Sequence, residues 1–170
     1  MELPYVEKSN LEKFRQGVAV VLRQPETNKI FFALRSDEEE EGAWVTDDNG
    51  EWVMPQGGLD LGEEPKGALL RELKEETGIS PEHVRFESEL SDVLAYKFEP
   101  LIEPATWIGQ AHKWYLCTFT GNCESDINLS HSSPAEFAKY EWKTVEEIVG
   151  RAQPQQKAVY IEVFKRFGLL

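Results

Sequence analysis

The sequence predicts a single α/β domain, residues 1–170, built around a mixed sheet. Short apolar runs typical of buried strands alternate with segments of helical periodicity, and no repeat or low-complexity linker divides the chain. The chain has 170 residues, of which 41% are hydrophobic and 29% are charged, which is ordinary for one globular domain with a real core.

The first predicted element is a hairpin. Two apolar runs, residues 17–22 and 29–34, flank the turn-forming segment 24–28. Their near-continuous hydrophobicity indicates strands that are buried on both faces. Asn49-Gly50 then favours a second tight turn, between short strands at 43–45 and 51–53.

A helix is predicted over residues 65–77. Pro65 suits the first helical turn, where a missing N–H costs nothing, and Gly78 suits the residue just past the end. Further along, the predicted elements are strands or extended segments at 83–90, 91–98, 113–119 and 140–142 and helices at 145–149 and 155–167.

Three glutamates of the predicted helix share one face. Glu72, Glu75 and Glu76 fall at positions i, i+3 and i+4. Like charges this close weaken a helix unless a cation lies among them, and Mg2+ prefers carboxylate and phosphate oxygens. An acidic helix face on its own is more often simply solvated, so the glutamates become a predicted Mg2+ site only through the wider pattern around them.

That pattern, G-x5-E-x7-R-E-U-x-E-E-x-G-U with U aliphatic, runs from Gly57 to Ile79 with every position filled. The segment is identified as a Nudix box. Similar segments outside the box resemble the asymmetric diadenosine tetraphosphate hydrolases and the related RNA 5′-pyrophosphohydrolases, and together the likeness spans about 14–168. These segments are 14–18, 52–58, 109–116, 126–129 and 134–137, with Trp142 just beyond.

The resemblance implies the Nudix fold, an α/β/α sandwich in which the box forms a loop–helix–loop over a mixed sheet. It implies that Mg2+, with Mn2+ as an alternative, is held by the Gly57 carbonyl, Glu72, Glu75, Glu76 and Glu136. It assigns structural roles within the motif to Glu63, Arg71 and Gly78. It suggests substrate contacts from Arg15, Arg35, Gln56, Tyr96 and Lys113, with Tyr96 stacking on a base and Lys113 facing the phosphate chain.

The implied chemistry is attack by a metal-activated water on a phosphoanhydride, without a covalent intermediate. Glu76 or Glu136 is expected to be the general base, and Glu75 remains possible.

Charge separates the candidate substrates. The chain has 18 basic and 31 acidic residues, a net charge of −13, which opposes the binding of long nucleic acids. We therefore expect asymmetric cleavage of dinucleoside polyphosphates, with diadenosine tetraphosphate giving ATP and AMP. Removal of pyrophosphate from triphosphorylated RNA 5′ ends is the alternative, and a non-catalytic nucleotide-binding protein is a third. The acidic run Glu38–Glu41 is expected near the cleft mouth.

Several positions depart from the family pattern. His112 stands where Gln is usual, Gln16 where Pro is usual, and segment 36–50 is longer than its usual counterpart. The last helix begins with Gln153-Pro154-Gln155-Gln156-Lys157, where relatives place an aromatic before Lys-Arg. Base recognition is therefore less predictable than catalysis.

The sequence also bears on location and assembly. Residues 1–16 carry charges and no apolar targeting segment, and no stretch of the chain resembles a membrane span. We expect a cytoplasmic protein without membrane contact, either a monomer or a weak dimer.

Overall fold

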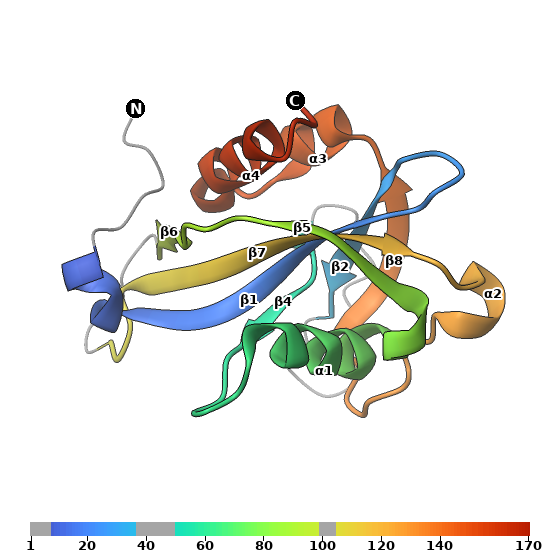
Figure 1. The fold of residues 1–170 in the computed structure, drawn as a ribbon, viewed down its shortest axis with the longest axis horizontal. Helices are drawn as coiled ribbons and strands as arrows, with labels where there is room; N and C mark the ends of the chain where they lie inside the picture. The colour runs from blue at the N-terminus through green and yellow to red at the C-terminus, as the bar shows by residue number, and fades with distance from the viewer. Residues whose placement is uncertain (1–7, 37–49, 99–104) are drawn as a thin grey trace.

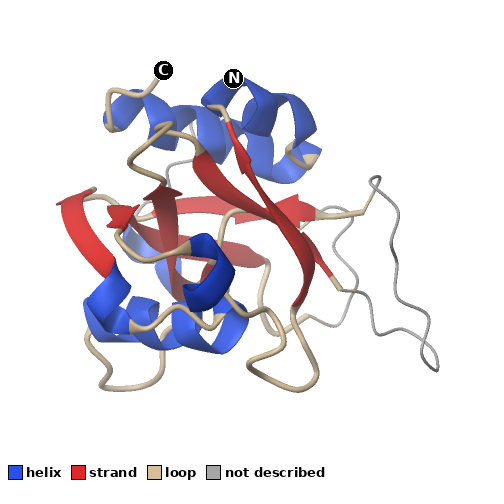
Figure 2. Ribbon diagram, turned by 90° about the vertical axis from the view of Figure 1, so that its right-hand side faces the viewer, coloured by secondary structure: helices blue, strands red, loops and turns tan. Residues whose placement is uncertain are grey.

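A computed structural model describes residues 8–36, 50–98 and 105–170, and their strands form one mixed sheet between two helical layers (Figure 1, Figure 2). The strands are β1 Phe14–Arg23, β2 Ile30–Arg35, β3 Trp52–Val53, β4 Gln56–Gly58, β5 Val84–Glu89, β6 Leu94–Lys97, β7 Gly109–Phe119 and β8 Phe137–Lys143. The α-helices are α1 Pro65–Thr77, α2 Cys123–Asp126, α3 Val145–Arg151 and α4 Pro154–Arg166, and short 3-10 helices span Lys8–Lys13 and Pro81–His83. The α/β/α sandwich is confirmed.

The sheet is organised around β1 and β7. Its central order is β3-β2-β1-β7-β5, while β4 pairs with β1, β6 with β7 and β8 with β2. The β1–β7 pair is parallel and runs from Phe14↔Gly109 to Arg23↔Thr118, whereas the other pairs are antiparallel. This register places Gly17 beside His112.

Two hydrophobic cores hold the layers together. On one face of the sheet, Trp114 and Leu116 pack with Val159, Tyr160 and other side chains of α4. On the opposite face, Leu69 and Leu73 of α1 pack against alternate strand residues. Figure 1 shows α3 and α4 on one side of the sheet and α1 on the other. Because side chains alternate along a strand, β1 and β7 supply both cores.

The predicted box helix has the predicted bounds. Pro65 occupies its first turn, and Gly78 caps its end at φ 73°, with its N–H donating to the Lys74 carbonyl at 3.0 Å. A left-handed φ of this kind favours glycine. The first hairpin is also confirmed, with β1 and β2 antiparallel around the predicted turn.

Other elements differ from the predictions. β7 begins at Gly109 because its first residues add to the long parallel ladder with β1, which the local sequence does not reveal. α2 and β4 were not predicted; α2 is short and capped by the Asn122 side chain, and β4 is three residues long. β3 is confined to Trp52–Val53. The predicted strand 43–45, Asn49 and Glu38–Glu41 lie outside the described residues.

Across the described ranges, none of the helices has the length and apolar character needed to cross a membrane.

Candidate active site

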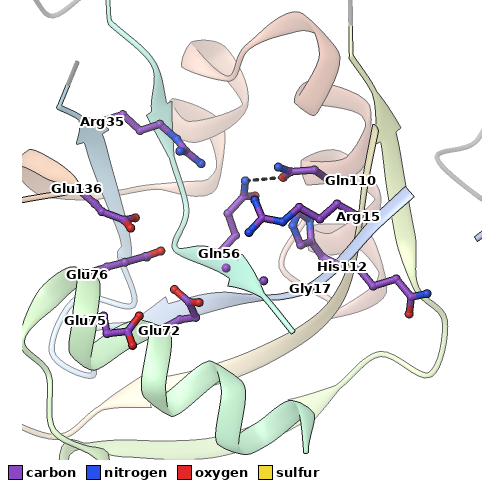
Figure 3. Close-up of a pocket in the computed structure, with 13 residues that line it drawn as sticks. Arg15, Gly17, Arg35, Gln56, Glu72, Glu75, Glu76, Gln110, His112 and Glu136 are labelled. Atoms are coloured by element: carbon purple, nitrogen blue, oxygen red, sulfur yellow. Dashed lines mark hydrogen bonds between the residues drawn. The ribbon is translucent and has the colours of Figure 1, made fainter. Parts of the chain in front are cut away.

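A cavity of about 220 Å³ lies where β1, β4 and β7 meet α1 (Figure 3). It contains four carboxylates, two arginines and four uncharged side chains that can form hydrogen bonds. Its lining consists of Arg15, Gln16, Gly17, Arg35, Gln56, Gly57, Gly58, Glu72, Glu75, Glu76, Gln110, His112 and Glu136. The structure thus brings most of the predicted site residues together.

Glu76 is the most buried carboxylate of the cavity, with 2% of its surface exposed. Its Oε2 atom is buried and has no hydrogen-bond partner. Burial, followed by the nearby charges of Glu136 and Glu72, raises the pKa of Glu76 well above its usual value. Burial is also the main reason that the pKa of Glu72 is raised. Such crowding is costly unless a cation or a proton is present.

Arg71 ties the box loop to α1. Its Nε and Nη2 atoms donate to the two Glu63 oxygens at 2.8 and 2.9 Å, and Nη2 also donates to the Gly58 carbonyl at 3.1 Å. The hydrogen bond from Arg71 is the main reason that the pKa of Glu63 is lowered to about 2. This bidentate pair fits the structural role predicted for both residues.

The same arginine also engages two of the predicted metal ligands. Arg71 Nη1 lies 2.9 Å from Glu72 Oε1 and 3.3 Å from Glu75 Oε2. Within the described residues, no three carboxylates converge on one ready-made coordination point. Mutual repulsion and the pull of Arg71 account for this spread. The donor set nevertheless fits a hard divalent cation, because it supplies carboxylate oxygens and the orphaned Glu76 Oε2 in one cavity.

Gly57 and Gly17 allow a close approach of backbone and side chains in this packing. A Cβ atom at Gly57 would overlap the Glu72 carboxyl group, and one at Gly17 would overlap the Gly57 carbonyl oxygen. Glycine at both positions therefore lets β4 lie between β1 and the carboxylates of α1.

The other side of the cavity is cationic and amide-rich. Arg15 and Arg35 line it with Gln56, and the Arg35 Nε atom has no hydrogen-bond partner, although it lies 3.7 Å from Glu51 Oε1. These two arginines suit the phosphates of a substrate.

Gln110 and His112 also line the cavity, and the sequence did not identify either as a site residue. Burial and then the charges of Arg15 and Arg35 lower the pKa of His112 to about 3, so its imidazole is neutral. The feature that places both residues here is the register of β7 against β1, which pairs Gln110 with Arg15 and His112 with Gly17. The local sequence does not carry that register.

Two predicted substrate contacts lie away from the cavity lining. Lys113 is on the opposite face of β7 from Gln110 and His112, where its Nζ donates to the Leu90 carbonyl and lies 3.8 Å from Glu89 Oε2. Tyr96 of β6 instead donates its hydroxyl hydrogen to Gln110 Oε1 at 2.9 Å. The structure therefore brings neither residue into the cavity.

Comparison with known families gives one match across nearly the whole chain. A model of the NUDIX domain matches residues 13–167. The chain is 40% identical over 128 residues to Nudix hydrolase 25 of Arabidopsis thaliana, covering 70% of this chain and 72% of that relative. It is 35% identical over 159 residues to the RNA pyrophosphohydrolase of Dinoroseobacter shibae, covering 91% of this chain and 92% of that relative. The RNA pyrophosphohydrolase of Erythrobacter litoralis is 33% identical over 169 residues, with 93% of each chain covered.

Solved structures share the fold at lower identity. The Caenorhabditis elegans Ap4A hydrolase aligns with a TM-score of 0.59 at 21% identity, covering 91% of this chain and 98% of that one. The Escherichia coli dihydroneopterin triphosphate pyrophosphohydrolase aligns with a TM-score of 0.64 at 16% identity, covering 89% of this chain and 95% of that one.

Proposed function

This chain belongs to the Nudix family of hydrolases, and from that premise we propose that it hydrolyses a phosphoanhydride bond of a nucleoside 5′-polyphosphate with the help of a divalent cation. One observation carries the proposal. The same cavity holds four carboxylates and two arginines, which together suit metal ions and a polyphosphate chain.

The proposed metal is Mg2+, or alternatively Mn2+, held by Glu72, Glu75, Glu76, Glu136 and the Gly57 carbonyl. When bound, the cation supplies charge neutralisation at the phosphates and makes water easier to deprotonate. Arg15 and Arg35 bind and orient the phosphate chain from the opposite side of the cavity.

A carboxylate of the cavity accepts the proton of the attacking water. Glu76 and Glu136 are the leading candidates for this base, with Glu75 as a further one. Glu76 lies deepest of these carboxylates, and Glu136 faces it closely enough for the two charges to interact. No covalent phosphoryl-enzyme intermediate is needed, because water attacks the phosphorus directly and the bond to the leaving group breaks in line.

Dinucleoside polyphosphates are our first choice of substrate, with diadenosine tetraphosphate cleaved to ATP and AMP. The net charge of −13 opposes a long polyanion more than a compact one. A compact substrate keeps its phosphates close together, where the arginines and bound metal ions would offset their charge.

Triphosphorylated RNA ends are the second candidate, favoured by a different observation. Two relatives named RNA pyrophosphohydrolase align over more than nine tenths of this chain at 33% and 35% identity. A purely nucleotide-binding role is a third possibility, and the complete set of box glutamates argues against it.

A substrate panel tests the proposal. The protein is incubated with Mg2+ and, separately, diadenosine tetraphosphate, nucleoside triphosphates, diphosphoinositol phosphates or triphosphorylated RNA, and the products are identified. Hydrolysis that stops with EDTA and returns with Mg2+ supports the proposal, and the ratio of kcat/KM values ranks the two leading substrates. Absence of turnover on every substrate with either Mg2+ or Mn2+ would overturn it.

A further inference from the structure

A chain of hydrogen bonds runs from the buried core to the cavity wall. The Met54 N–H donates to the Tyr160 hydroxyl at 3.2 Å, and that hydroxyl donates to Gln156 Oε1 at 3.1 Å. Gln156 Nε2 then donates to the Tyr96 hydroxyl at 3.2 Å, which donates to Gln110 Oε1 at 2.9 Å. Tyr160 and Gln156 are each only 1% exposed, so the inner part of this chain is shielded from water.

The direction of the chain is fixed at its buried end. A backbone N–H can only donate, so the Tyr160 oxygen accepts from Met54 and its hydrogen is available for Gln156 Oε1. The Gln156 amide then presents its NH2 group to Tyr96, and the Tyr96 hydroxyl donates its hydrogen to Gln110 Oε1. Each amide is thus held in one of its two possible orientations.

The donor-to-acceptor direction of these hydrogen bonds continues into the cavity through two glutamines. Gln110 Oε1 also accepts from Gln56 Nε2 at 3.1 Å, a contact drawn in Figure 3. Both residues line the cavity. Because Gln110 uses its oxygen and Gln56 uses its nitrogen in this contact, their remaining polar atoms are the Gln110 Nε2 donor and the Gln56 Oε1 acceptor.

We propose that Tyr96 and Gln156 are positioning residues, which set the Gln110 and Gln56 amides as a donor–acceptor pair that selects a nucleoside group able both to accept and to donate. The inference rests on the proposed function. A phosphate oxygen only accepts, so it would satisfy Gln110 and leave Gln56 Oε1 facing negative charge. Two groups of a nucleoside have the required chemistry: a base edge with an amino group beside a ring nitrogen, and a ribose hydroxyl.

The test compares substrates that differ in one recognised group. Diadenosine tetraphosphate is set against its inosine counterpart, which replaces the base amino group by a carbonyl, and against its deoxyribose counterparts, which lack the 2′ or the 3′ hydroxyl. For the wild-type enzyme we expect one of these changes to lower kcat/KM by about threefold to tenfold, mainly through KM. The change that is penalised identifies the base or the ribose as the group selected.

Tyr96→Phe should abolish that discrimination, because removing the hydroxyl frees the Gln110 amide to rotate. Tyr140→Phe removes a tyrosine hydroxyl outside the chain of hydrogen bonds and should keep the wild-type ratio. If Tyr96→Phe does not fold, Gln110→Glu serves instead, since it keeps an acceptor for Tyr96 and Gln56 but removes the amide donor. Gln110→Glu should lose the same discrimination.

The outcomes separate this inference from the proposed function. If Tyr96→Phe slows all substrates equally, or if the wild-type enzyme turns over every analogue at the same rate, the positioning role is wrong while the hydrolase assignment stands. If the wild-type enzyme hydrolyses no member of the wider panel, the proposed function itself fails.

Discussion

The backbone of Gly57 lies directly against the Glu72 carboxyl group, so closely that a Cβ atom at Gly57 would overlap it. Gly57 belongs to β4 and Glu72 to α1, so this contact sets how closely the box loop approaches its helix. A predicted metal ligand thus depends on the absence of a side chain on a neighbouring strand.

Replacing Gly57 by Ala should therefore lower kcat/KM by more than tenfold, because Glu72 must move to make room. Gly67→Ala is the matched control: Gly67 lies in α1, and a Cβ there meets nothing within 4 Å. The control should keep full activity and gain about 0.5–1 kcal/mol of stability, since alanine favours a helix. Kinetics and thermal melting of both variants check this, and equal activity in the two would contradict the packing argument.

Glu76→Gln should abolish turnover while leaving the fold intact. The loss should appear in kcat rather than in substrate affinity, because the predicted metal site stabilises charge that grows in the transition state. Glu82→Gln, at an exposed position, is the control for removing one carboxylate. Steady-state kinetics with circular dichroism make the measurement, and near-normal kcat in Glu76→Gln would refute its place in the metal site.

The metal-free protein should lose stability as pH rises. The raised pKa of Glu76 means that the folded state holds a proton that the unfolded state has released. Its contribution to stability is complete below the ordinary carboxyl pKa, about 4.3, and is lost as pH rises through the raised folded value. Thermal melting in EDTA should show the melting temperature of the wild-type protein falling as pH rises across this window, and falling less in Glu76→Gln. The same dependence of melting temperature on pH in both proteins would contradict the assignment.

Glu136→Ala should lower activity by about tenfold or more, because general acid–base catalysis typically contributes about 10²-fold to 10⁴-fold to a rate. Glu136 precedes β8 and lines the cavity, where its charge helps to raise the pKa of Glu76. Glu146→Ala, at an exposed position in α3, should leave the rate unchanged. An unchanged rate in Glu136→Ala would show that it is neither base nor ligand.

Neutralising Glu38, Glu39, Glu40 and Glu41 to Gln should raise kcat/KM on triphosphorylated RNA at low salt and change diadenosine tetraphosphate hydrolysis little. The gain should shrink as salt rises, because screening weakens the repulsion of distant phosphates. A control variant neutralises four exposed acids elsewhere, Glu26, Glu82, Glu124 and Glu146. If both variants respond alike, or if both substrates respond equally, this run does not discriminate between substrates.

The sequence alone determined the box helix and the side chains that share its acidic face. The bounds of α1, the left-handed Gly78 and the shared face of Glu72, Glu75 and Glu76 all follow from interactions between residues within a few positions of one another. The family pattern also indicated Glu136 and the cationic contacts of Arg15 and Arg35, which the structure places in the same cavity.

Only the tertiary structure decided which of the remaining polar side chains face that cavity. The parallel register of β1 and β7 places Gly17 beside His112, and strand alternation then turns Gln110 and His112 inward and Lys113 outward. The Tyr96 hydroxyl forms hydrogen bonds with Gln110 and Gln156, which lie far from each other along the chain. Local periodicity carries no information about strand register or long-range hydrogen bonds, because both depend on how distant segments pack.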